Sequence, residues 1–283
     1  MRLLIVQVNR TAENSEAAQF MKTVAELVGK NAALVKQNDT RLTFRLPRGG
    51  ISDLRCWFYT YIHRLNEVET FHAIVQAEKD GFDAVIINCF GDPMLREVRQ
   101  AVNIPVLGIA EASMRLAAMM GARFGVVTAS EKQIHDYKEL MKRYGLKEQA
   151  VPPRPTPEPA EEQFEICVDA HRGIEAFKQV GRELIADGAE VLIPGCGLMA
   201  PALRLAPGAE REYPNGLTEV DGVPVMDVTG TAVKLAEMLV ALKQAGSCWI
   251  SRKGFFAQAP SEVIELSQGV LKYNGPGFWD IEL

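Results

Sequence analysis

The chain contains one short sequence pattern twice, and this internal repeat limits the folds that it can adopt. The segments DGFDAVIINC (residues 80–89) and DGAEVLIPGC (residues 187–196) align without gaps, and in each an apolar run leads to a terminal cysteine. The similarity continues into the apolar segments 102–121 and 220–239. Because both copies keep the same order of apolar and polar segments, the repeat predicts two related structural units.

Both units are expected to belong to the α/β class. Segments with helical spacing, such as 66–81, alternate with apolar runs of strand length at 3–8, 84–88, 105–109, 123–129, 190–194 and 223–227. Continuous apolar strands between helices are typical of parallel sheets that helices cover on both faces. We therefore predict two pseudo-symmetric lobes, each a parallel sheet flanked by helices, with the active site in the cleft between them. The expected boundaries place residues 1–107 and 226–283 in the lobe that carries Cys89, and residues 108–225 in the lobe that carries Cys196.

The composition favours a small-molecule partner. The net charge is -5 and no long run of Lys or Arg occurs, which argues against nucleic acid as a partner. The apolar stretch in MRLLIVQVNR is too short for a signal peptide or a membrane span, so we expect a cytoplasmic protein with no membrane partner. The five cysteines form no C-x-x-C pair and the four histidines lack zinc-site spacing, which predicts free thiols and no metal site. Three of the cysteines lie outside the repeat and are expected to be packing residues: Cys56, Cys167 and Cys248.

The two repeated cysteines, Cys89 and Cys196, are the strongest candidates for chemistry. Ligands bind outside the carboxyl ends of parallel strands, so the two thiols would face one cleft if the lobes face each other. Two such thiols can invert a carbon next to a carbonyl, because one removes a proton from one face while the other returns a proton to the opposite face. An ordinary thiol has a pKa of about 8.5, close enough to neutrality for both roles, and no cofactor is required. The alternative is that each cysteine is only a small apolar residue at the end of a buried strand.

Several short segments resemble the aspartate/glutamate/hydantoin racemase superfamily, and most closely its hydantoin racemase branch. They are INCFGDP (87–93), GIAEAS (108–113), VVTAS (126–130), IPGCGLMAP (193–201) and VPVMD (223–227). The resemblance implies two α/β lobes and racemisation without a cofactor, by two cysteines that correspond to Cys89 and Cys196. It also implies that Asn9 and Thr128 anchor the substrate.

Other candidate substrate-binding residues lie next to these positions in the sequence. Glycines beside a cysteine let the backbone approach a ligand closely, and backbone amides at a helix start can hold a carboxylate or an enolate oxygen. These candidates are Thr11, Asn88, Phe90, Gly195, Gly197 and Leu198. Asp92 is expected either to cap a helix or to orient the thiol or the substrate.

Two other functions fit the same residues. A protein of this fold can use a cysteine as an acid or a nucleophile, as a decarboxylase, a cis/trans isomerase, a lyase or a hydrolase of a small carbonyl compound does. A two-lobed protein can also bind a small molecule without catalysis. The segments 46–64 and 151–165 and the tail from Gly246 lie outside the resemblance and would either cover the cleft or contact another subunit. The aromatic residues of the tail favour a homo-oligomer.

Overall fold

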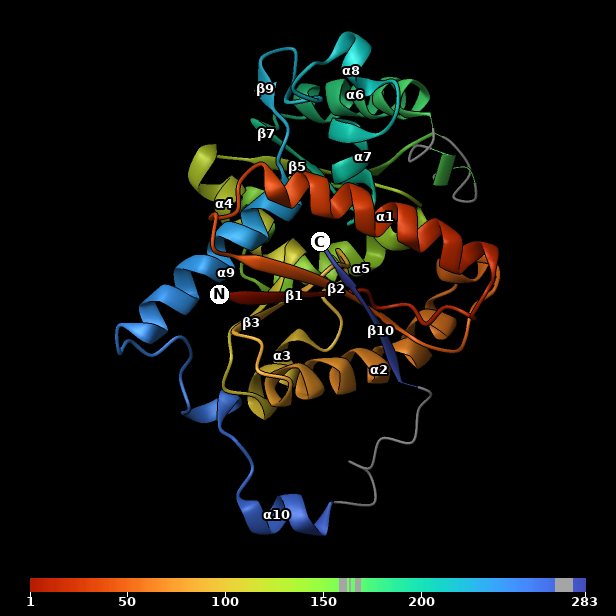
Figure 1. Ribbon diagram of the computed structural model, residues 1–283. Helices are drawn as coiled ribbons and strands as arrows, with labels where there is room; N and C mark the ends of the chain where they lie inside the picture. Colours follow the sequence, from red (N-terminus) through yellow and green to blue (C-terminus); the bar gives the residue numbers. More distant parts are fainter. Residues whose placement is uncertain (158–161, 163, 166–168, 268–276) are drawn as a thin grey trace.

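The described residues form two mainly parallel sheets with helices packed around them (Figure 1). The computed structural model describes residues 1–157, 162, 164–165, 169–267 and 277–283. The first sheet has five strands in the order β10-β2-β1-β3-β4, and the second has three in the order β6-β5-β7. The bounds are β1 Arg2–Val6, β2 Arg41–Pro47, β3 Ala84–Ile87, β4 Val106–Gly108, β5 Phe124–Thr128, β6 Arg154–Pro155, β7 Val191–Pro194 and β10 Phe278–Glu282. The prediction of an α/β protein with parallel strands flanked by helices is confirmed.

The α-helices follow most of the strands and cover the sheet faces. They are α1 Glu16–Ala33, α2 Thr60–Lys79, α3 Leu95–Ala101, α4 Ile109–Met120, α5 Lys132–Arg143, α6 Ala170–Ala186, α7 Met199–Leu205, α8 Ala209–Glu212, α9 Val228–Gln244 and α10 Ser261–Leu266. Short 3₁₀ helices are η1 Leu54–Phe58, η2 Lys147–Gln149 and η4 Gly254–Phe256. Within the described ranges, no helix combines the length and the apolar character that a membrane span requires.

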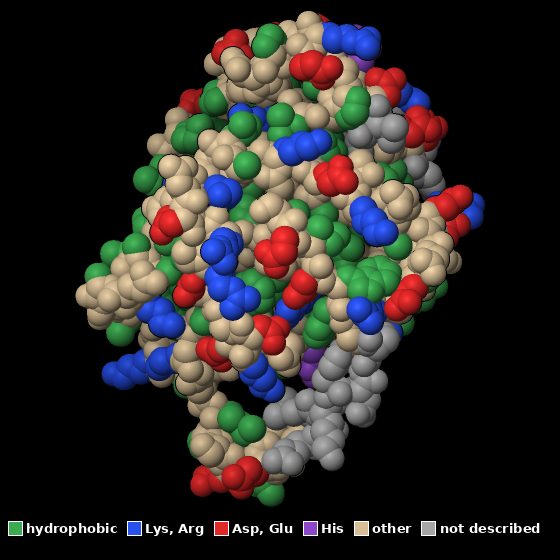
Figure 2. Space-filling model, in the orientation of Figure 1, with side chains coloured by type: hydrophobic (Ala, Val, Ile, Leu, Met, Phe, Trp, Pro, Cys, Tyr) green, Lys and Arg blue, Asp and Glu red, His purple; other side chains and the backbone are tan. Residues whose placement is uncertain are grey.

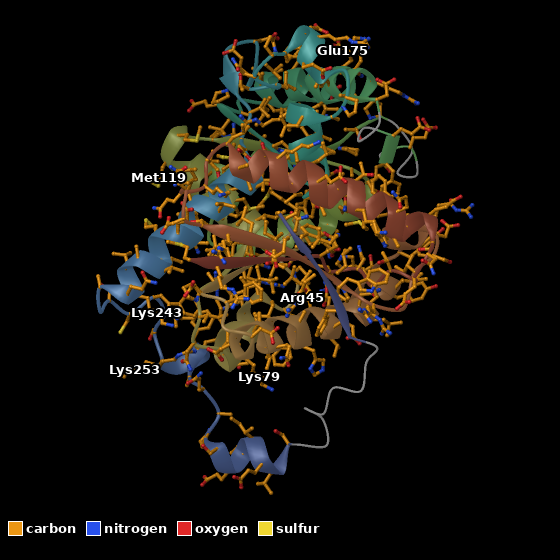
Figure 3. All side chains as sticks on the ribbon, viewed as in Figure 1. Arg45, Lys79, Met119, Glu175, Lys243 and Lys253 are labelled. Carbon is orange, nitrogen blue, oxygen red and sulfur yellow. The ribbon has the colours of Figure 1, made fainter. Side chains whose placement is uncertain are left out.

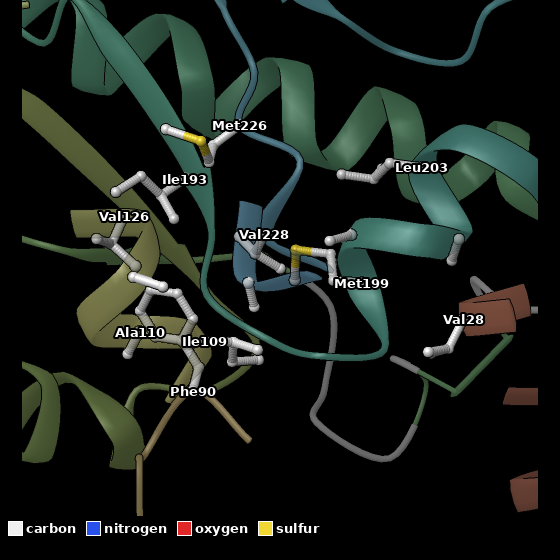
Figure 4. Packing of buried hydrophobic residues seen from close by; sticks show 14 of the residues in the cluster. Val28, Phe90, Ile109, Ala110, Val126, Ile193, Met199, Leu203, Met226 and Val228 are labelled. Atoms are coloured by element: carbon white, nitrogen blue, oxygen red, sulfur yellow. The ribbon is translucent and has the colours of Figure 1, made fainter. Parts of the chain in front are cut away.

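One hydrophobic cluster joins the two sheets. It includes Ile5 of β1, Val126 of β5 and Ile193 of β7, all of which are almost fully buried. Figure 4 shows how Phe90, which follows β3, lies close to Ile109 at the start of α4 and below the two second-sheet residues. Since the two sheets share this cluster, the residue boundaries proposed for two separate lobes stay a prediction.

Strand β1 is buried on both of its faces, as its continuous apolar sequence predicts. Leu3 and Ile5 belong to the cluster that joins the sheets, whereas Leu4 and Val6 belong to a second cluster that includes Ile74 of α2. Side chains alternate between the two faces of a strand, so each face of β1 needs its own cover. The strand therefore ends deep in the molecule, where Gln7 and Asn9 are also buried.

Two strands of the first sheet were not predicted, and a buried charge explains why. The sequence RLTFRLP of β2 contains Arg45, which is only 3% exposed and breaks the apolar pattern. Its guanidinium donates to both carboxylate oxygens of Asp280 in β10, at 2.7 and 2.8 Å, and to Asp80 at 2.7 Å. Strand β10 pairs antiparallel with β2, and Figure 3 shows Arg45 beside it. Strand β10 thus supplies the carboxylate that compensates the buried charge of Arg45. Because the two residues are far apart in the sequence, no local pattern predicts this pairing.

The predicted strand at 223–227 is wrong in part. Only Val223–Pro224 forms a strand, β9, and it pairs antiparallel with β8, Glu219–Val220. Val225 then makes a single parallel bridge to Leu192 of β7. Asp227 already caps helix α9 through the Gly230 amide, at 2.8 Å, so the chain leaves the sheet after one bridge.

The described part of the tail after Gly246 contacts α3 and the loop that follows it, and residues Phe278–Glu282 form β10. Trp249 Nε1 donates to the Asn103 carbonyl at 2.7 Å, and Arg252 donates to the Arg99 carbonyl at 2.6 Å. Beyond this anchored part, the segment with α10 stands away from the body of the molecule (Figure 2). Cys248 is exposed, not packed as predicted, while Cys56 is half-buried and Cys167 lies outside the described residues. The homo-oligomer stays a prediction.

Candidate active site

The two repeated cysteines line the same cavity. Cys89 follows β3 by two residues and Cys196 follows β7 by two residues, so each lies just beyond the carboxyl end of a parallel strand. We call this space the inner cavity. It contains about 690 Å³ that protein atoms do not occupy, a volume that includes open solvent at its mouth. It is lined by Gln7, Asn9, Trp57, His63, Asn88, Cys89, Phe90, Ala129, Gln133, Tyr137, Phe164, Cys196, Gly197, Leu198 and Met199. The site therefore draws on both sheets and on two of the segments outside the repeat.

The two cysteine loops touch each other through a glycine. A Cβ atom on Gly197 would lie 2.6 Å from Asn88 Oδ1 and 2.9 Å from the Asn88 carbonyl oxygen, closer than a side chain at this position can be. Asn88 is itself held by Gln7, whose Oε1 accepts from Asn88 Nδ2 at 3.2 Å. The absence of a side chain at Gly197 thus sets how near the loop of Cys196 comes to the loop of Cys89.

Tyr137 of α5 fixes the loop of Cys196 from the other side. Its hydroxyl donates to the Gly195 carbonyl at 2.6 Å, and its ring lies 5.2 Å from the ring of Phe90. Burial raises the pKa of Tyr137 well above its ordinary value, so the hydroxyl keeps its proton and remains a donor. One buried residue therefore contacts the residue that precedes Cys196 and the residue that follows Cys89.

The surroundings of Cys196 favour the neutral thiol. Burial raises its pKa above the ordinary value, and the nearby charge of Cys89 adds to the increase. The amides of Leu198 and Met199 act in the opposite direction, and the Leu198 amide donates to Cys196 Sγ at 3.4 Å. Since burial is the largest effect, Cys196 holds its proton more firmly than an exposed cysteine.

Cys89 has a different neighbour, the imidazole of His63 on α2. Cys89 Sγ lies 3.7 Å from His63 Nε2, and His63 Nδ1 lies 3.6 Å from Glu67 Oε1. Burial alone lowers the pKa of His63, but the contacts with Cys89 and Glu67 raise it to about 10. At neutral pH the ring is therefore an imidazolium, placed between a sulfur atom and a carboxylate.

The candidate substrate-binding residues from the sequence fall into two groups. Five of them line the inner cavity: Asn9, Asn88, Phe90, Gly197 and Leu198. Three are not part of its lining: Thr11, Thr128 and Gly195. Each of the three lies in the protein framework: the Thr11 amide donates to Pro47, the Thr128 hydroxyl donates to the Ser130 carbonyl at 3.1 Å, and Gly195 accepts from Tyr137. Their roles in binding stay predictions, with the contacts favouring a supporting role.

Eight lining residues were not predicted as part of the site: Gln7, Trp57, His63, Ala129, Gln133, Tyr137, Phe164 and Met199. Trp57 comes from the aromatic segment 46–64 and Phe164 from the Pro-rich segment 151–165; their rings meet edge to face at 5.5 Å. Both segments therefore contribute to the wall of the cavity, one of the two outcomes that the sequence left open. The only available signal was the aromatic content of segment 46–64. His63 lies on α2, and Gln133 and Tyr137 lie on α5, in neither case within a motif.

Three polar atoms of the lining lack a hydrogen-bond partner within the described part of the chain. They are Asn9 Oδ1, Trp57 Nε1 and Gln133 Oε1, and all are buried. Buried polar atoms usually have partners, so unsatisfied ones in a cavity indicate positions for ligand groups. Here they offer one donor and two acceptors.

Asp92 caps a helix, which is one of its two predicted roles. The capped helix is α4, not α3, which begins three residues after Asp92 in the sequence. The Asp92 carboxylate accepts from the amides of Ala110 and Glu111 at the start of α4, at 3.1 and 2.7 Å, and from the Tyr144 hydroxyl at 2.7 Å. Burial raises its pKa to about 7. Because Asp92 follows Cys89 by three residues, this anchor ties the Cys89 loop to α4.

A second, more polar cavity adjoins the first. We call it the outer cavity; it shares Trp57, His63, Cys89, Gln133 and Tyr137 with the inner one, and charged residues such as Arg64 and Asp136 line it further out. A molecule entering through the outer cavity would meet His63 and Cys89 together. Among the described residues, no three His, Cys, Asp or Glu side chains lie close enough together to hold a metal ion.

The overall fold is similar to those of known racemases. The structure of allantoin racemase from Klebsiella pneumoniae matches with a TM-score of 0.69 and 26% sequence identity, over 92% of this chain and 94% of that one. The allantoin racemase of Pseudomonas fluorescens matches with a TM-score of 0.69 and 27% identity, over 92% of this chain and 97% of that one. The fold is therefore that of a racemase.

The sequence comparisons define the family. A hydantoin racemase from a Pseudomonas species is 33% identical over 230 residues, which are 81% of this chain and 84% of that protein. The family described as Asp/Glu/Hydantoin racemase matches residues 63–236. The chain belongs to the Asp/Glu/Hydantoin racemase family, as the motifs in the sequence indicate.

Proposed function

We propose that the protein is a racemase of a neutral cyclic carbon acid of the hydantoin type, with Cys89 and Cys196 as the two opposing acid/base residues. The observation that carries the proposal is that both cysteines, at equivalent strand ends of the repeat, line one cavity and that their loops are in contact. Family membership supports the reaction class, and the hydantoin and allantoin racemases among its relatives support the type of ring.

The reaction needs only proton transfers. A thiolate on one side removes the proton from the carbon next to the carbonyl, so that the C–H bond breaks, an S–H bond forms, and the electron pair moves into an enolate. The thiol on the other side then gives its proton to the opposite face of the carbon and becomes a thiolate. Atoms and charge balance within the site, and an organic cofactor or a metal ion has no step to perform.

The lining of the inner cavity favours a neutral ring over an amino acid. Among the described lining residues none is Lys, Arg, Asp or Glu, so a substrate with a free carboxylate and ammonium group would have no side chain of opposite charge beside the thiols except His63. A hydantoin ring has N–H donors and C=O acceptors, which match the unpaired Asn9 Oδ1, Gln133 Oε1 and Trp57 Nε1. Substrate selection in this site would thus depend on neutral hydrogen bonds.

Proton NMR in D₂O tests the function directly. We expect single enantiomers of 5-substituted hydantoins to lose the signal of the ring C–H and their optical rotation, with no mass change beyond deuterium. Aspartate and glutamate are the matched comparison and are expected to exchange at least about a hundredfold more slowly, because unpaired charge in a buried site is costly. Amino acids that exchange as fast as hydantoins would contradict the substrate class, and no exchange with either group would contradict the function.

The glycine that lets the cysteine loops touch provides a second prediction. We expect Gly197→Ala to lower kcat by roughly 10- to 100-fold, because the added methyl group displaces the backbone around Asn88 and separates the thiols. Gly91→Ala adds the same group to the other loop at an ordinary distance of 3.6 Å from Cys89 Sγ and is expected to cost about threefold or less. Steady-state kinetics on both variants, with circular dichroism as the check on folding, compares them. Equal activities would show that the contact does not set the thiol spacing.

The contact between Cys89 and His63 favours one second candidate, cleavage of a small carbonyl compound with Cys89 as nucleophile. A thiol beside an imidazole that a carboxylate orients is a common arrangement for covalent catalysis. This reaction would form a covalent adduct on Cys89 during turnover, which mass spectrometry detects. Proton transfer leaves the mass of the protein unchanged, so the same sample separates the two functions.

A further inference from the structure

We propose that His63, oriented by Glu67, keeps Cys89 as a thiolate while Cys196 remains a thiol, so that the two cysteines begin each turnover in fixed and different roles. Cys89 Sγ lies 3.7 Å from His63 Nε2, and His63 Nδ1 lies 3.6 Å from Glu67 Oε1, so the imidazole stands between the sulfur atom and the carboxylate. The resting thiolate is a property of the protein without substrate. What the thiolate does next rests on the racemisation proposed above.

Helix α2 brings the two supporting residues onto one face. His63 and Glu67 are separated by one helical turn, so their side chains point in the same direction. Arg64 Nη1 donates to Glu67 Oε1 at 2.6 Å and leaves the Glu67 side chain in a fixed position, 11% exposed. Burial alone raises the pKa of Glu67, but hydrogen bonds from His63 and Arg64 lower it below the ordinary value. Glu67 is therefore a carboxylate that faces the imidazole.

An imidazolium next to a sulfur atom favours the thiolate over the thiol, since the opposite charges stabilise each other. Arg64 supplies a second positive charge whose field reaches Cys89. The other titratable groups that line the outer cavity with His63 come from three elements. They are Asp92 of the loop after β3, Glu97 of α3, and Lys132, His135, Asp136, Tyr137, Glu139 and Arg143 of α5. These groups carry both signs of charge, so the direct contact with Cys89 remains the dominant interaction of His63.

Among the described residues, no cation contacts Cys196 as His63 contacts Cys89. Its nearest polar contacts are the Leu198 and Met199 amides, and the neighbouring Tyr137 is neutral. Burial therefore controls its state and keeps the proton on sulfur. The two cysteines are equivalent by the repeat but differ in ionisation, because His63 and Glu67 belong to a helix that serves only one of them.

The asymmetry gives each turnover a direction. From the resting state, Cys89 takes the proton of the enantiomer whose C–H bond faces it, and the Cys196 thiol gives its own proton to the other face. Cys89 is then a thiol and Cys196 a thiolate, so one proton must return from Cys89 to Cys196 before the resting state is restored. The dyad of His63 and Glu67 acts through Cys89, and we regard both as positioning residues.

Alkylation by iodoacetamide, which reacts with thiolates, tests the inference without a substrate. Peptide mass spectrometry gives separate rates for Cys89 and Cys196 in the wild-type protein and in His63→Gln. At pH 6.5 we expect Cys89 to react at least about tenfold faster in the wild type than in His63→Gln, with the rates converging near pH 9.5 where an ordinary thiol is also ionised. His72→Gln is the matched control, because His72 lies on the same helix and outside both cavities, and its rates should equal those of the wild type.

Equal Cys89 rates at pH 6.5 in wild type and His63→Gln would overturn the inference. If the variant does not fold, the wild type alone decides: a Cys89 rate that falls by about fiftyfold from pH 8.5 to pH 6.5 is the behaviour of an ordinary thiol with a pKa of about 8.5 and has the same consequence. Glu67→Gln should give an intermediate rate, since the amide still accepts from His63 but carries no charge. Because no substrate is present, these results stand whether or not the protein racemises hydantoins.

Discussion

Replacing either Cys89 or Cys196 with alanine is expected to lower racemisation by roughly 10²- to 10⁴-fold, the usual contribution of a positioned acid or base. Inversion needs a proton acceptor on one face of the carbon and a donor on the other, so neither cysteine can do both. Optical rotation with single enantiomers of a 5-substituted hydantoin measures the loss. Cys248→Ala is the matched control, because Cys248 is exposed and is not among the residues that line the cavity, and its activity should equal that of the wild type.

The two variants should differ in what they retain. In Cys196→Ala, the Cys89 thiolate can still remove a proton and return a deuteron to the same face, so one enantiomer should exchange with D₂O without inversion. In Cys89→Ala, the remaining Cys196 is a buried thiol with a raised pKa, and exchange of the other enantiomer should be much slower. Racemisation at the wild-type rate in both single variants would exclude the two-cysteine mechanism. Similar exchange in both would leave the mechanism intact but contradict different resting roles.

The two cysteines could be predicted from sequence because their signal is local. Each follows a short apolar run, and the repeat supplies a second copy with the same spacing, so Cys89 and Cys196 stand out from Cys56 and Cys248. The same reasoning located β3 and β7 to within one or two residues, since both are buried on both faces. Where burial makes a segment uniformly apolar, its sequence alone determines the structural assignment.

The residues that distinguish the two cysteines depend on contacts between distant segments. His63 becomes part of the site only because α2 packs against β1 and β3, which turns its first half toward the end of β3. Gln133 and Tyr137 likewise reach the cavity from α5, and neither is part of a recognisable motif. The charged strand β2 was missed for the same reason, as Arg45 is neutralised by Asp280 from the far end of the chain. Strands and helices that are buried along their whole length can be predicted from their own sequence. Polar residues whose partners lie in a distant segment cannot, because the partner is not part of the local pattern.

Asp92→Ala removes the carboxyl group that anchors the Cys89 loop, and we expect it to lower the free energy of unfolding more than the other variants do. Asp92 is buried and accepts from two amides and from the Tyr144 hydroxyl, so Asp92→Ala leaves three buried donors without their partner. At about 1–3 kcal/mol for each unsatisfied group, and with some relaxation, we expect the free energy of unfolding to fall by roughly 3–5 kcal/mol. Urea denaturation at pH 5 measures it. Tyr144→Phe, which removes one donor and leaves the Asp92 carboxyl group in place, is the control and should cost about 1 kcal/mol.

The pH dependence of stability gives a second test of the same residue. In the folded protein burial raises the pKa of Asp92 to about 7, whereas an unfolded Asp titrates near 3.9. Between these values the folded state binds the additional proton, so the contribution of Asp92 to stability is complete below about pH 4 and is lost as the pH rises to about 7. The difference in unfolding free energy between wild type and Asp92→Asn should therefore change by up to roughly 4 kcal/mol from pH 4 to pH 8, with the wild type becoming relatively less stable. A constant difference would show that Asp92 is ionised in the folded protein throughout this range, and that its three donors outweigh the cost of burying the charge.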